Sequence, residues 1–348
     1  MTLSGNRVAV VILNWNGKSF LEKFLPGINQ SCKGVADLIV ADNASSDDSI
    51  DFLEKHYPSI RIIRLPKNNG YTGGYNEALQ QVNNEYFVLL NSDVEVKDDW
   101  IRPVLALMDS DPKIAACQPK ILSQSNPEEF EYAGAGGGFI DKFGFPFCRG
   151  RIFHSIEKDL GQYDDDCQIF WATGACMFIR SSCFHELHGF DNSFFAHMEE
   201  IDLCWRLQNA GYQIWYCGKS KVYHVGGGTL PKHNPKKTYY NFRNNLFLLY
   251  KNLDPKSFRK VHLFRMIVDT IAAVKFLFSN GWKDSSAVFQ AHRDFQRGKK
   301  TYKDLRSRSK LTDFQSNNGI YQRSIVFSYY LAGCKKFSEL KGSIMRGQ

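Results

Sequence analysis

Residues 86–96 read YFVLLNSDVEV, and the rest of the chain is best interpreted from this stretch outward. The apolar run Tyr86–Leu90 predicts a buried strand, because it is too short for a core helix. The run stops at Asn91-Ser92-Asp93, and the carboxyl end of a central strand is where open α/β sheets bind ligands. Mg²⁺ or Mn²⁺ on a diphosphate takes one or two carboxylates as ligands. A plain Asx turn would use the same three residues without a ligand.

Strands and helices alternate through about the first ninety residues. Apolar, β-branched runs predict the strands, and polar starts followed by amphipathic spacing predict the helices. The strands are expected at Val8–Leu13, Asp37–Ala41, Ile60–Arg64 and Tyr86–Leu90, and the helices from Ser19 to about Ile28, from Ser46 or Asp47 to His56, and near Tyr75–Gln81. This alternation requires a largely parallel sheet with right-handed crossovers, so the expected fold class is α/β.

Polar residues stand at or near the carboxyl end of each strand. They are Asn14 and Asn16, Asp42 and Asn43, Asn68 and Asn69, and Asn91 and Asp93. The carboxyl ends of parallel strands share one edge of a sheet, so these residues are expected to converge on a single site. A carboxylate such as Asp42 suits a base N–H or a ribose hydroxyl, while Asp93 suits a divalent metal ion. A nucleotide diphosphate is therefore the expected ligand.

The phosphate-binding loops of other nucleotide-binding folds are missing from the sequence. No G-x-G-x-x-G fingerprint follows the first strand, and there is no Walker A loop. Gly70, Gly73 and Gly74 can let the backbone approach a phosphate, or they can form a loose turn. The residues by themselves leave both interpretations open.

The segment between residues 123 and 168 is rich in Gly and Phe and has little periodicity. It follows an expected helix at Trp100–Asp109 and an expected strand near Ala115–Ile121. A loop of this length inside a compact domain is usually functional or mobile. We therefore interpret it as a flap over the bound substrates.

Two neighbouring carboxylates begin a later helical pattern. A strand is expected at Cys176–Ile179, and from Glu199 the spacing predicts a helix with an Asp202–Arg206 ion pair. The helix dipole favours carboxylates in a first turn, which alone would explain Glu199 and Glu200. The functional interpretation is a general base that takes a proton from a hydroxyl group, with its pKa raised by desolvation beside aromatic residues.

A single histidine, His224, lies on an expected short strand before the glycines Gly226–Gly228. A lone histidine on a strand is most often structural. Imidazole can also join carboxylate and phosphate oxygens around Mn²⁺, which makes His224 a candidate metal ligand. The glycines would then let the loop close over a phosphate.

The composition is that of an ordinary globular protein. Of the 348 residues, 43% are hydrophobic and 23% are charged, which suits one large domain or a domain with an appendage. The start of the chain lacks a signal-peptide pattern, and no apolar stretch has the length of a membrane span. The nine cysteines contain no C-x-x-C pair, which indicates reduced thiols rather than disulfides or a zinc site. A cytoplasmic protein is expected.

Basic charge is concentrated towards the C-terminus. Residues 251–310 carry fifteen Lys and Arg against five Asp, a net charge of +10, while the whole chain has +8. Residues 255–300 are expected to form helices. The interrupted apolar segment His262–Phe278 can lie in a membrane interface, or it can pack on the first domain or on a second subunit. No nucleic-acid recognition motif accompanies the charge, so nucleic acid is not an expected partner.

Together these motifs resemble a family 2 glycosyltransferase of the GT-A fold, in the branch of rhamnosyltransferases and galactofuranosyltransferases. The resemblance rests on the blocks ILNWNG, ADNASSDDS, NNGYTGGYNEA, LLNSDVEV, WATGACMFIR, GFDNSFFAHMEEIDLCWRLQNAGY, VYHVGGGT and YYNFRNNLFLLYKN, which cover about residues 7–250. It implies a Rossmann-like, mostly parallel central sheet in residues 1–250. Residues 251–348 would form a basic, mainly helical C-terminal extension.

The resemblance also implies roles for individual residues. Those implied at the nucleotide are Asn14, Trp15, Asn16, Asp42, Asn43, Asn69, Gly70, Asn76 and Asn91. Those implied on the acceptor side are Trp171, Gly174 and Glu199, the implied metal ligands are Asp93 and His224, and the implied catalytic base is Glu200. Asn91 and Glu200 depart from the family's pattern, which has aspartate at both positions.

The reaction implied by the resemblance is a single inverting displacement. Glu200 would deprotonate an acceptor hydroxyl, which would attack the anomeric carbon of a UDP- or dTDP-linked sugar. Mn²⁺ or Mg²⁺ would neutralise charge on the leaving diphosphate. The implied acceptor is a glycan or lipid-linked saccharide of cell-surface polysaccharide synthesis, at the inner face of the membrane. A catalytically silent nucleotide-sugar-binding or scaffold protein on the same fold is the alternative, and a homo-oligomer is compatible with both.

Overall fold

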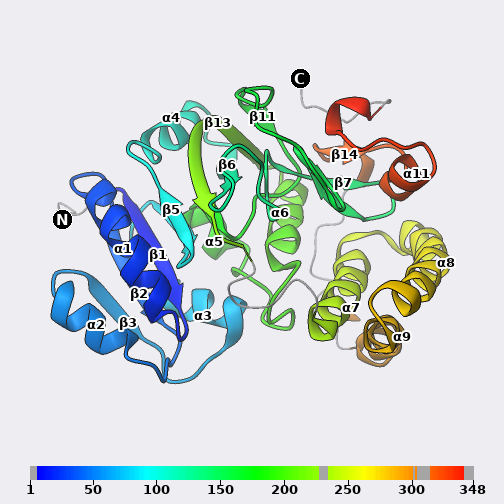
Figure 1. The fold of residues 1–348 in the computed structure, drawn as a ribbon, viewed down its shortest axis with the longest axis horizontal. Coiled ribbons are helices and arrows are strands. Elements are labelled where there is room, and N and C mark those ends of the chain that lie inside the picture. The colour runs from blue at the N-terminus through cyan, green and yellow to red at the C-terminus, as the bar shows by residue number, and fades with distance from the viewer. Residues whose placement is uncertain (1–5, 227–233, 301, 304–313, 341–348) are drawn as a thin grey trace.

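The computed structural model of the protein describes residues 6–226, 234–300, 302–303 and 314–340. Figure 1 shows a large twisted sheet flanked by helices, with a smaller sheet and a group of C-terminal helices beside it. The N-terminal strands and the C-terminal helices lie at opposite ends of the molecule in this view.

The apolar run at residue 86 forms a central strand, as predicted. Strand β4 spans Tyr86–Asn91, and β5 spans Val94–Val96. Alternate side chains of β4 belong to two separate hydrophobic clusters: Phe87 and Leu89 lie in one, and Val88 lies in the other. Because both faces of the strand are buried, its sequence is apolar without alternation.

The large sheet has the strand order β11-β13-β6-β12-β4-β1-β2-β3 in the described residues, and β5 pairs with β13. The remaining bounds are β1 Val8–Asn14, β2 Asp37–Asp42, β3 Arg61–Arg64, β6 Ile114–Ser123, β11 Cys167–Gln168, β12 Cys176–Arg180 and β13 Gln213–His224. Strands β4, β1, β2 and β3 run parallel, which confirms the α/β prediction. Strand β12 runs antiparallel to both β4 and β6.

The helices between these strands are α1 Lys18–Cys32, α2 Ser49–His56, α3 Gly70–Leu79, α4 Arg102–Ser110, α5 Ser181–Glu186 and α6 Glu199–Asn209. The predicted cap at Ser19 is wrong, because α1 begins before it and Gly17 takes the cap position. The predicted start of α3 near Tyr75 is also wrong. A Cβ on Gly74 would lie 2.8 Å from the Leu13 side chain, so the glycines let α3 pack closely on β1 and do not form a loose turn.

A second, smaller sheet occupies much of the segment that we expected to be an irregular flap. Its strands are β7 Gly138–Asp141, β8 Pro146–Cys148, β9 Arg151–Ile152, β10 Ser155–Ile156 and β14 Ile320–Tyr321, in the order β10-β9-β8-β7-β14. The prediction of a long loop is therefore wrong, and its role as a flap over the substrates stays a prediction. Strands this short give no readable alternation. A Cβ on Gly138 would lie 2.2 Å from the Trp171 ring, so that glycine is required for packing.

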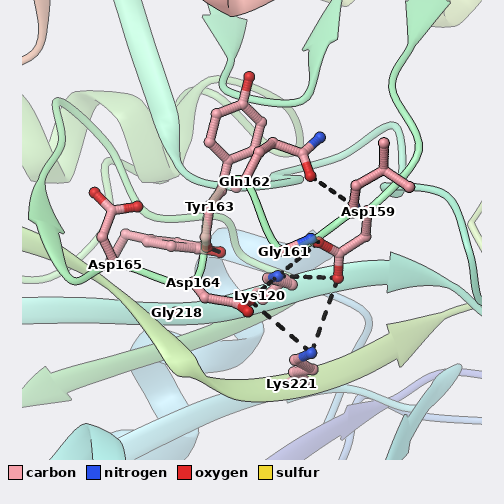
Figure 2. Close-up of polar contacts among 12 residues, drawn as sticks. Lys120, Asp159, Gly161, Gln162, Tyr163, Asp164, Asp165, Gly218 and Lys221 are labelled. Atoms are coloured by element: carbon pink, nitrogen blue, oxygen red, sulfur yellow. Dashed lines mark hydrogen bonds and ion pairs between the residues drawn. The ribbon is translucent and has the colours of Figure 1, made fainter.

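An ion-pair cluster around the buried Lys120 holds the end of this segment against the large sheet (Figure 2). Lys120 of β6 is fully buried, and its Nζ lies 2.8 Å from Asp159 Oδ1 and 2.5 Å from Asp164 Oδ1. Lys221 of β13 lies 3.9 Å from Asp159 Oδ2. Because a buried ammonium group is stable only when it is paired, this cluster anchors the chain around residues 159–164.

The C-terminal part is helical, as predicted for residues 255–300. Its elements are α7 Pro235–Asn252, α8 Pro255–Ser279, α9 Trp282–Gly298, the 3₁₀ turns Phe314–Ser316 and Phe337–Glu339, and α11 Ile325–Tyr330. Strand β14 returns to pair with β7, so this part of the chain also completes the second sheet. A domain boundary at residue 250 stays a prediction. None of the helices in the described ranges is long and apolar enough to cross a bilayer. The nine cysteines all lie in these ranges, and none of them forms a disulfide bond.

Candidate active site

The carboxyl ends of β1 and β2 and the loop after β3 form one hydrogen-bonded row. The convergence of all four strand ends on a single binding site stays a prediction. Asn14 at the end of β1 lies opposite Asp42 at the end of β2, and its Nδ2 donates to Asp42 Oδ1 at 3.1 Å. Asn43 extends the row, because its Nδ2 donates to Asn68 Oδ1 at 3.1 Å and to the Gly70 carbonyl at 3.0 Å. The side chains of Asn14, Asp42 and Asn43 are buried, so their hydrogen bonds hold this edge of the sheet together from within the protein.

The loop after β1 carries two more of the predicted nucleotide residues. Trp15 keeps 50% of its surface exposed at this edge. Asn16 has a left-handed backbone with φ 52°, and its Oδ1 accepts a hydrogen bond from the Ser46 N–H at 2.7 Å. Trp15 therefore offers an exposed aromatic surface, while Asn16 joins two neighbouring loops.

Three other predicted nucleotide residues lie at the start of α3 or within it. Asn69 Nδ2 donates to Glu77 Oε2 at 2.9 Å. Gly70 has φ 69°, and a Cβ there would lie 2.7 Å from the Phe195 ring. Asn76 Nδ2 donates to the Phe190 carbonyl at 2.7 Å. The side-chain amides of Asn69 and Asn76 thus make contacts within the protein, and Asn76 joins α3 to the loop before α6.

The two predicted metal ligands are in direct contact. Asp93 lies in the turn before β5, and β5 pairs with β13 so that Val94 is opposite His224. Asp93 Oδ1 lies 3.1 Å from His224 Nε2, and both side chains are nearly buried. Asn91, which ends β4, donates its backbone N–H to the Ala175 carbonyl at 3.0 Å. The predicted closure of the glycine loop over phosphate involves residues 227 and 228, which lie outside the described residues.

Sequence reasoning missed Glu131, which contacts the other nitrogen of the same imidazole. His224 Nδ1 lies 3.4 Å from Glu131 Oε2. Burial alone would lower the pKa of His224, but the contacts with Asp93 and Glu131 raise it to about 10. Glu131 comes from the segment of residues 123–168, whose irregular sequence gives no sign that one of its carboxylates reaches this strand end.

This arrangement fits a divalent metal ion. The described residues contain no group of three or more His, Cys, Asp and Glu side chains placed to hold one. The protein would thus supply two converging donors, Asp93 Oδ1 and His224 Nε2. Diphosphate oxygens and water complete the coordination of Mg²⁺ or Mn²⁺ at such sites. A carboxylate on the second imidazole nitrogen, here Glu131, is the usual means of orienting a histidine ligand.

Helix α6 begins with two carboxylates, each of which has one oxygen without a hydrogen-bonding partner in the described residues. Glu199 Oε2 and Glu200 Oε2 are buried, and neither forms a hydrogen bond with any described residue. Burial raises the pKa of both groups, to about 7 for Glu200, and repulsion from Glu200 raises that of Glu199 further. Glu200 is the more exposed of the two. It can therefore take up and release a proton near neutral pH, which is the property of a general base.

The turn just before α6 has a strained backbone, and it fixes the position at which the helix begins. Phe195, His197 and Met198 have positive φ values of 64°, 70° and 73°, which is costly for residues other than glycine. The fully buried Asn244 of α7 holds this turn, because its Nδ2 donates to the Ala196 and His197 carbonyls, each at 2.8 Å. Asn244 lies in the block YYNFRNNLFLLYKN, for which sequence reasoning assigned no role.

The loop of residues 171–175 contacts helix α6, because the Ala172 N–H donates to Cys204 Sγ at 3.5 Å. Tyr71 Oη donates to the Gly174 carbonyl at 2.9 Å. Burial and the nearby charges of Glu199 and Glu200 raise the pKa of Tyr71. Trp171 is buried, and its indole N–H donates to a carbonyl of β7 at 2.9 Å. Gly174 is thus held by Tyr71, while the indole of Trp171 points towards the second sheet.

The loop of residues 171–175 is also linked to the Asp93–His224 pair through other side chains. Thr173 Oγ1 donates to the Ala133 carbonyl at 3.3 Å, and the Ala133 N–H donates to Glu131. Glu131 in turn contacts His224. One chain of contacts therefore joins the candidate metal ligands to the loop of residues 171–175, which in turn contacts α6.

Known proteins share both the sequence pattern and the fold. The family model for Glycosyl transferase family 2 matches residues 9–187. The N-acetylglucosaminyl-diphospho-decaprenol L-rhamnosyltransferase of Mycobacterium tuberculosis is 24% identical over 233 residues, which are 62% of this chain and 75% of that protein. Rhamnosyltransferase WbbL of Escherichia coli is 24% identical over 258 residues, which are 72% of this chain and 93% of that protein.

Two solved structures have the same fold at low sequence identity. The crystal structure of GalNAc-T7 with UDP, GalNAc and Mn²⁺ has a TM-score of 0.56 and 16% identity, and the match covers 89% of this chain and 59% of that one. The mannosyltransferase PcManGT from Pyrobaculum calidifontis, in complex with GDP-Man and Mn²⁺, has a TM-score of 0.50 and 12% identity, with 88% and 85% covered. These matches confirm the expected GT-A fold.

Proposed function

The chain belongs to glycosyl transferase family 2 and is a glycosyltransferase, and from this premise we propose a metal-dependent, inverting sugar transfer. The donor is a nucleotide diphosphate sugar, and the acceptor is a hydroxyl group of a glycan or lipid-linked saccharide. The observation that carries the proposal is the pair of buried carboxylates at the start of α6, Glu199 and Glu200. Neither carboxylate has a neutralising cation in the described residues. Helix α6 also contacts the loop of residues 171–175, which is linked through Ala133 and Glu131 to His224.

Glu200 is the catalytic base in this proposal. It accepts the proton of the acceptor hydroxyl while that oxygen attacks the anomeric carbon, and its raised pKa suits a group that must hold this proton. The turn held by Asn244 fixes the carboxylate against the incoming hydroxyl. Glu199 and Gly174 lie on the acceptor side, and a single displacement of this kind inverts the anomeric centre.

Asp93 and His224 would hold Mn²⁺ or Mg²⁺. When bound, such an ion neutralises the charge that develops on the leaving diphosphate. Glu131 keeps the His224 ring in place from its other nitrogen. The two solved relatives named above contain Mn²⁺ together with UDP or with GDP-Man, which supports a divalent ion and a nucleotide here as well.

The nucleotide is proposed to lie along the row of strand ends. Trp15 offers exposed aromatic surface there, and Asp42 lies in the hydrogen-bonded row beside Asn14. The wider set of residues proposed at the nucleotide comprises Asn14, Trp15, Asn16, Asp42, Asn43, Asn69, Gly70, Asn76 and Asn91.

The relatives support a lipid-linked acceptor and a bacterial-type polysaccharide pathway. The name of the Mycobacterium tuberculosis relative gives L-rhamnose as the transferred sugar and a decaprenol diphosphate saccharide as the acceptor. We propose the same class of acceptor for this chain, in the cytoplasm at the inner membrane face. Residues 255–300 are proposed to make the membrane contact, and nucleic acid is not a proposed partner.

A thermal-shift screen tests the proposed function. UDP-, dTDP- and GDP-linked sugars are added with Mn²⁺, with Mg²⁺ or with EDTA, and one donor class should raise the melting temperature only in the presence of metal. Asp93→Ala should abolish this shift. The matched control is Asp99→Ala, which removes an exposed carboxylate paired with Arg102.

The alternative, a catalytically silent binding protein, predicts a different result. Donor binding would then persist, but no acceptor would release nucleoside diphosphate. A protein that shows neither a metal-dependent shift nor nucleoside diphosphate release with any donor would overturn the proposal.

A further inference from the structure

Helix α8 carries charged residues on its buried face. Arg265 and Asp269 are only 2% and 1% exposed, and Arg265 Nε donates to Asp269 Oδ1 at 3.0 Å. His292 Nε2 of α9 lies 2.9 Å from Asp269 Oδ2, and Arg265 also donates to Asn245 of α7. The polar network therefore binds α8 to both α7 and α9.

The opposite face of α8 is apolar and exposed to solvent. Its residues recur every three or four positions and so lie on one side of the helix. They are Leu263, Met266, Ile267, Ile271, Val274, Leu277 and Phe278, with between 42% and 84% of their surface exposed. This is the reverse of a surface helix of a soluble protein, which turns its apolar side inward. The satisfied Arg265–Asp269 network holds the helix in this orientation.

The exposed apolar surface continues onto α11. The rings of Phe264 and Phe327 are 5.7 Å apart, and Lys275 Nζ lies 4.5 Å from the centre of the Tyr330 ring. Phe327, Tyr330 and Leu331 are themselves 47%, 45% and 79% exposed. We call these residues, together with the apolar residues of α8, the α8–α11 face. Figure 1 shows both helices at the outer edge of the molecule, away from the N-terminal strands.

The charge around this face indicates what it binds. Every exposed charged residue of α8 is basic: Lys256, Arg259, Lys260 and Lys275. By helical spacing the first three lie on the same side as the apolar residues, at the N-terminal end of α8. Two copies of such a face would bring like charges together, whereas a bilayer with anionic lipids offers both an apolar interface and negative charge.

We propose that the α8–α11 face docks on an anionic lipid bilayer. The apolar residues of α8 and α11 enter the interface, and Lys256, Arg259 and Lys260 contact lipid headgroups. An apolar surface of this extent on a soluble protein marks an interaction site. This inference deepens the proposed function and rests on it for its purpose, because a lipid-linked acceptor would be reached from that surface.

Vesicle co-sedimentation of the full chain tests the docking surface. The protein should bind vesicles of phosphatidylcholine mixed with phosphatidylglycerol, and bind phosphatidylcholine alone far more weakly, with salt reducing the difference. Ile271→Glu should weaken binding about tenfold or more, because one buried aliphatic side chain is lost from the interface and a like charge is placed against the lipid. Leu160→Glu is the control, since Leu160 is 84% exposed and lies in the segment after β10.

Three outcomes would overturn the docking surface. The first is wild-type protein that binds neither kind of vesicle. The second is an equal loss of vesicle binding in Ile271→Glu and Leu160→Glu. The third is a wild-type protein that binds no vesicles but forms a dimer in analytical ultracentrifugation, which Ile271→Glu dissociates. The donor thermal shift is measured without lipid and should be the same in Ile271→Glu and wild type. A protein that binds vesicles but no nucleotide sugar would keep this inference while the proposed function fails.

Discussion

Two groups of carboxylates on helix α6 differ in their charged partners and in the direction in which their pKa is shifted. Asp202 accepts hydrogen bonds from Arg206 Nε at 2.8 Å and from Lys251 Nζ at 2.9 Å. Burial alone would raise the pKa of Asp202, but these partners lower it to about 2. Glu199 and Glu200 lie in the same first turn, but no cation of the described part of the chain lies beside them, and burial raises the pKa of both.

The difference separates carboxylates that hold the fold from carboxylates that can react. The cluster around Lys120 repeats the pattern of Asp202, because its buried ammonium group is matched by Asp159 and Asp164 (Figure 2). A paired buried charge is costly to break and chemically inert. An unpaired buried carboxylate opposes folding and is therefore retained for another reason, which we assign to proton transfer.

The largest effect is expected when the unpaired group is neutralised. Glu200→Gln should lower kcat by about a thousandfold, because general base catalysis contributes about 10²–10⁴-fold. Donor binding, measured by calorimetry, should change little. Glu22→Gln, at an exposed position on α1, is the control. Normal turnover in Glu200→Gln with an inactive Glu199→Gln protein would move the role of base to Glu199.

Neutralising the paired carboxylate, Asp202, should lower the stability of the fold. Asp202→Asn leaves the buried Lys251 and Arg206 without a full counter-charge and should destabilise the protein by about 3 kcal/mol in urea unfolding. Glu54→Gln breaks the exposed pair with Arg64 and should cost about 1 kcal/mol or less. If the two losses were equal, burial of the pair would not be the property that matters.

Glu131 differs from both groups, because it contacts another side chain of the site rather than a structural cation. Glu131→Gln should weaken Mn²⁺ binding about 10–100-fold, because His224 loses the carboxylate that orients it. Electron paramagnetic resonance of free Mn²⁺ measures this affinity without turnover. Glu129→Gln, in the same segment, is the matched control. Unchanged Mn²⁺ affinity in Glu131→Gln would show that the carboxylate only packs against the ring.

The smallest effect is a pH dependence. The pKa of Glu200 is about 7, so kcat/KM should rise about tenfold per pH unit below 7 and level off above it, because the base must be ionised. Burial raises the pKa of Glu200 in the folded protein above its ordinary value of 4.5. The stability gained from the protonated form is therefore present below pH 4.5 and lost as the pH rises through about 7. The residual activity of Glu200→Gln should not show this rise of kcat/KM with pH. A wild-type profile flat between pH 5 and 7 would contradict the assignment.

Much of the fold was predictable because its signals are local. The run Tyr86–Leu90 and the strand–helix alternation before it identify the parallel strands, and the polar residues after each strand identify their shared edge. Asp93 and His224 were each predicted as metal ligands, from their residue types and from the family resemblance, and the structure places them in contact. The strands in the segment of residues 123–168 were not predicted, because strands of two to four residues leave no readable period.

The sequence by itself determined the α/β class, the family and the edge of the sheet where the polar residues gather, since these depend on neighbours in the chain. Only the tertiary structure decided that Glu131 contacts His224, that Asn244 holds the turn before α6, and that α8 faces outward with its apolar side. Each of these depends on segments far apart in the sequence. Burial and pairing of a charge are properties of that packing, so no local pattern could distinguish Glu200 from Asp202.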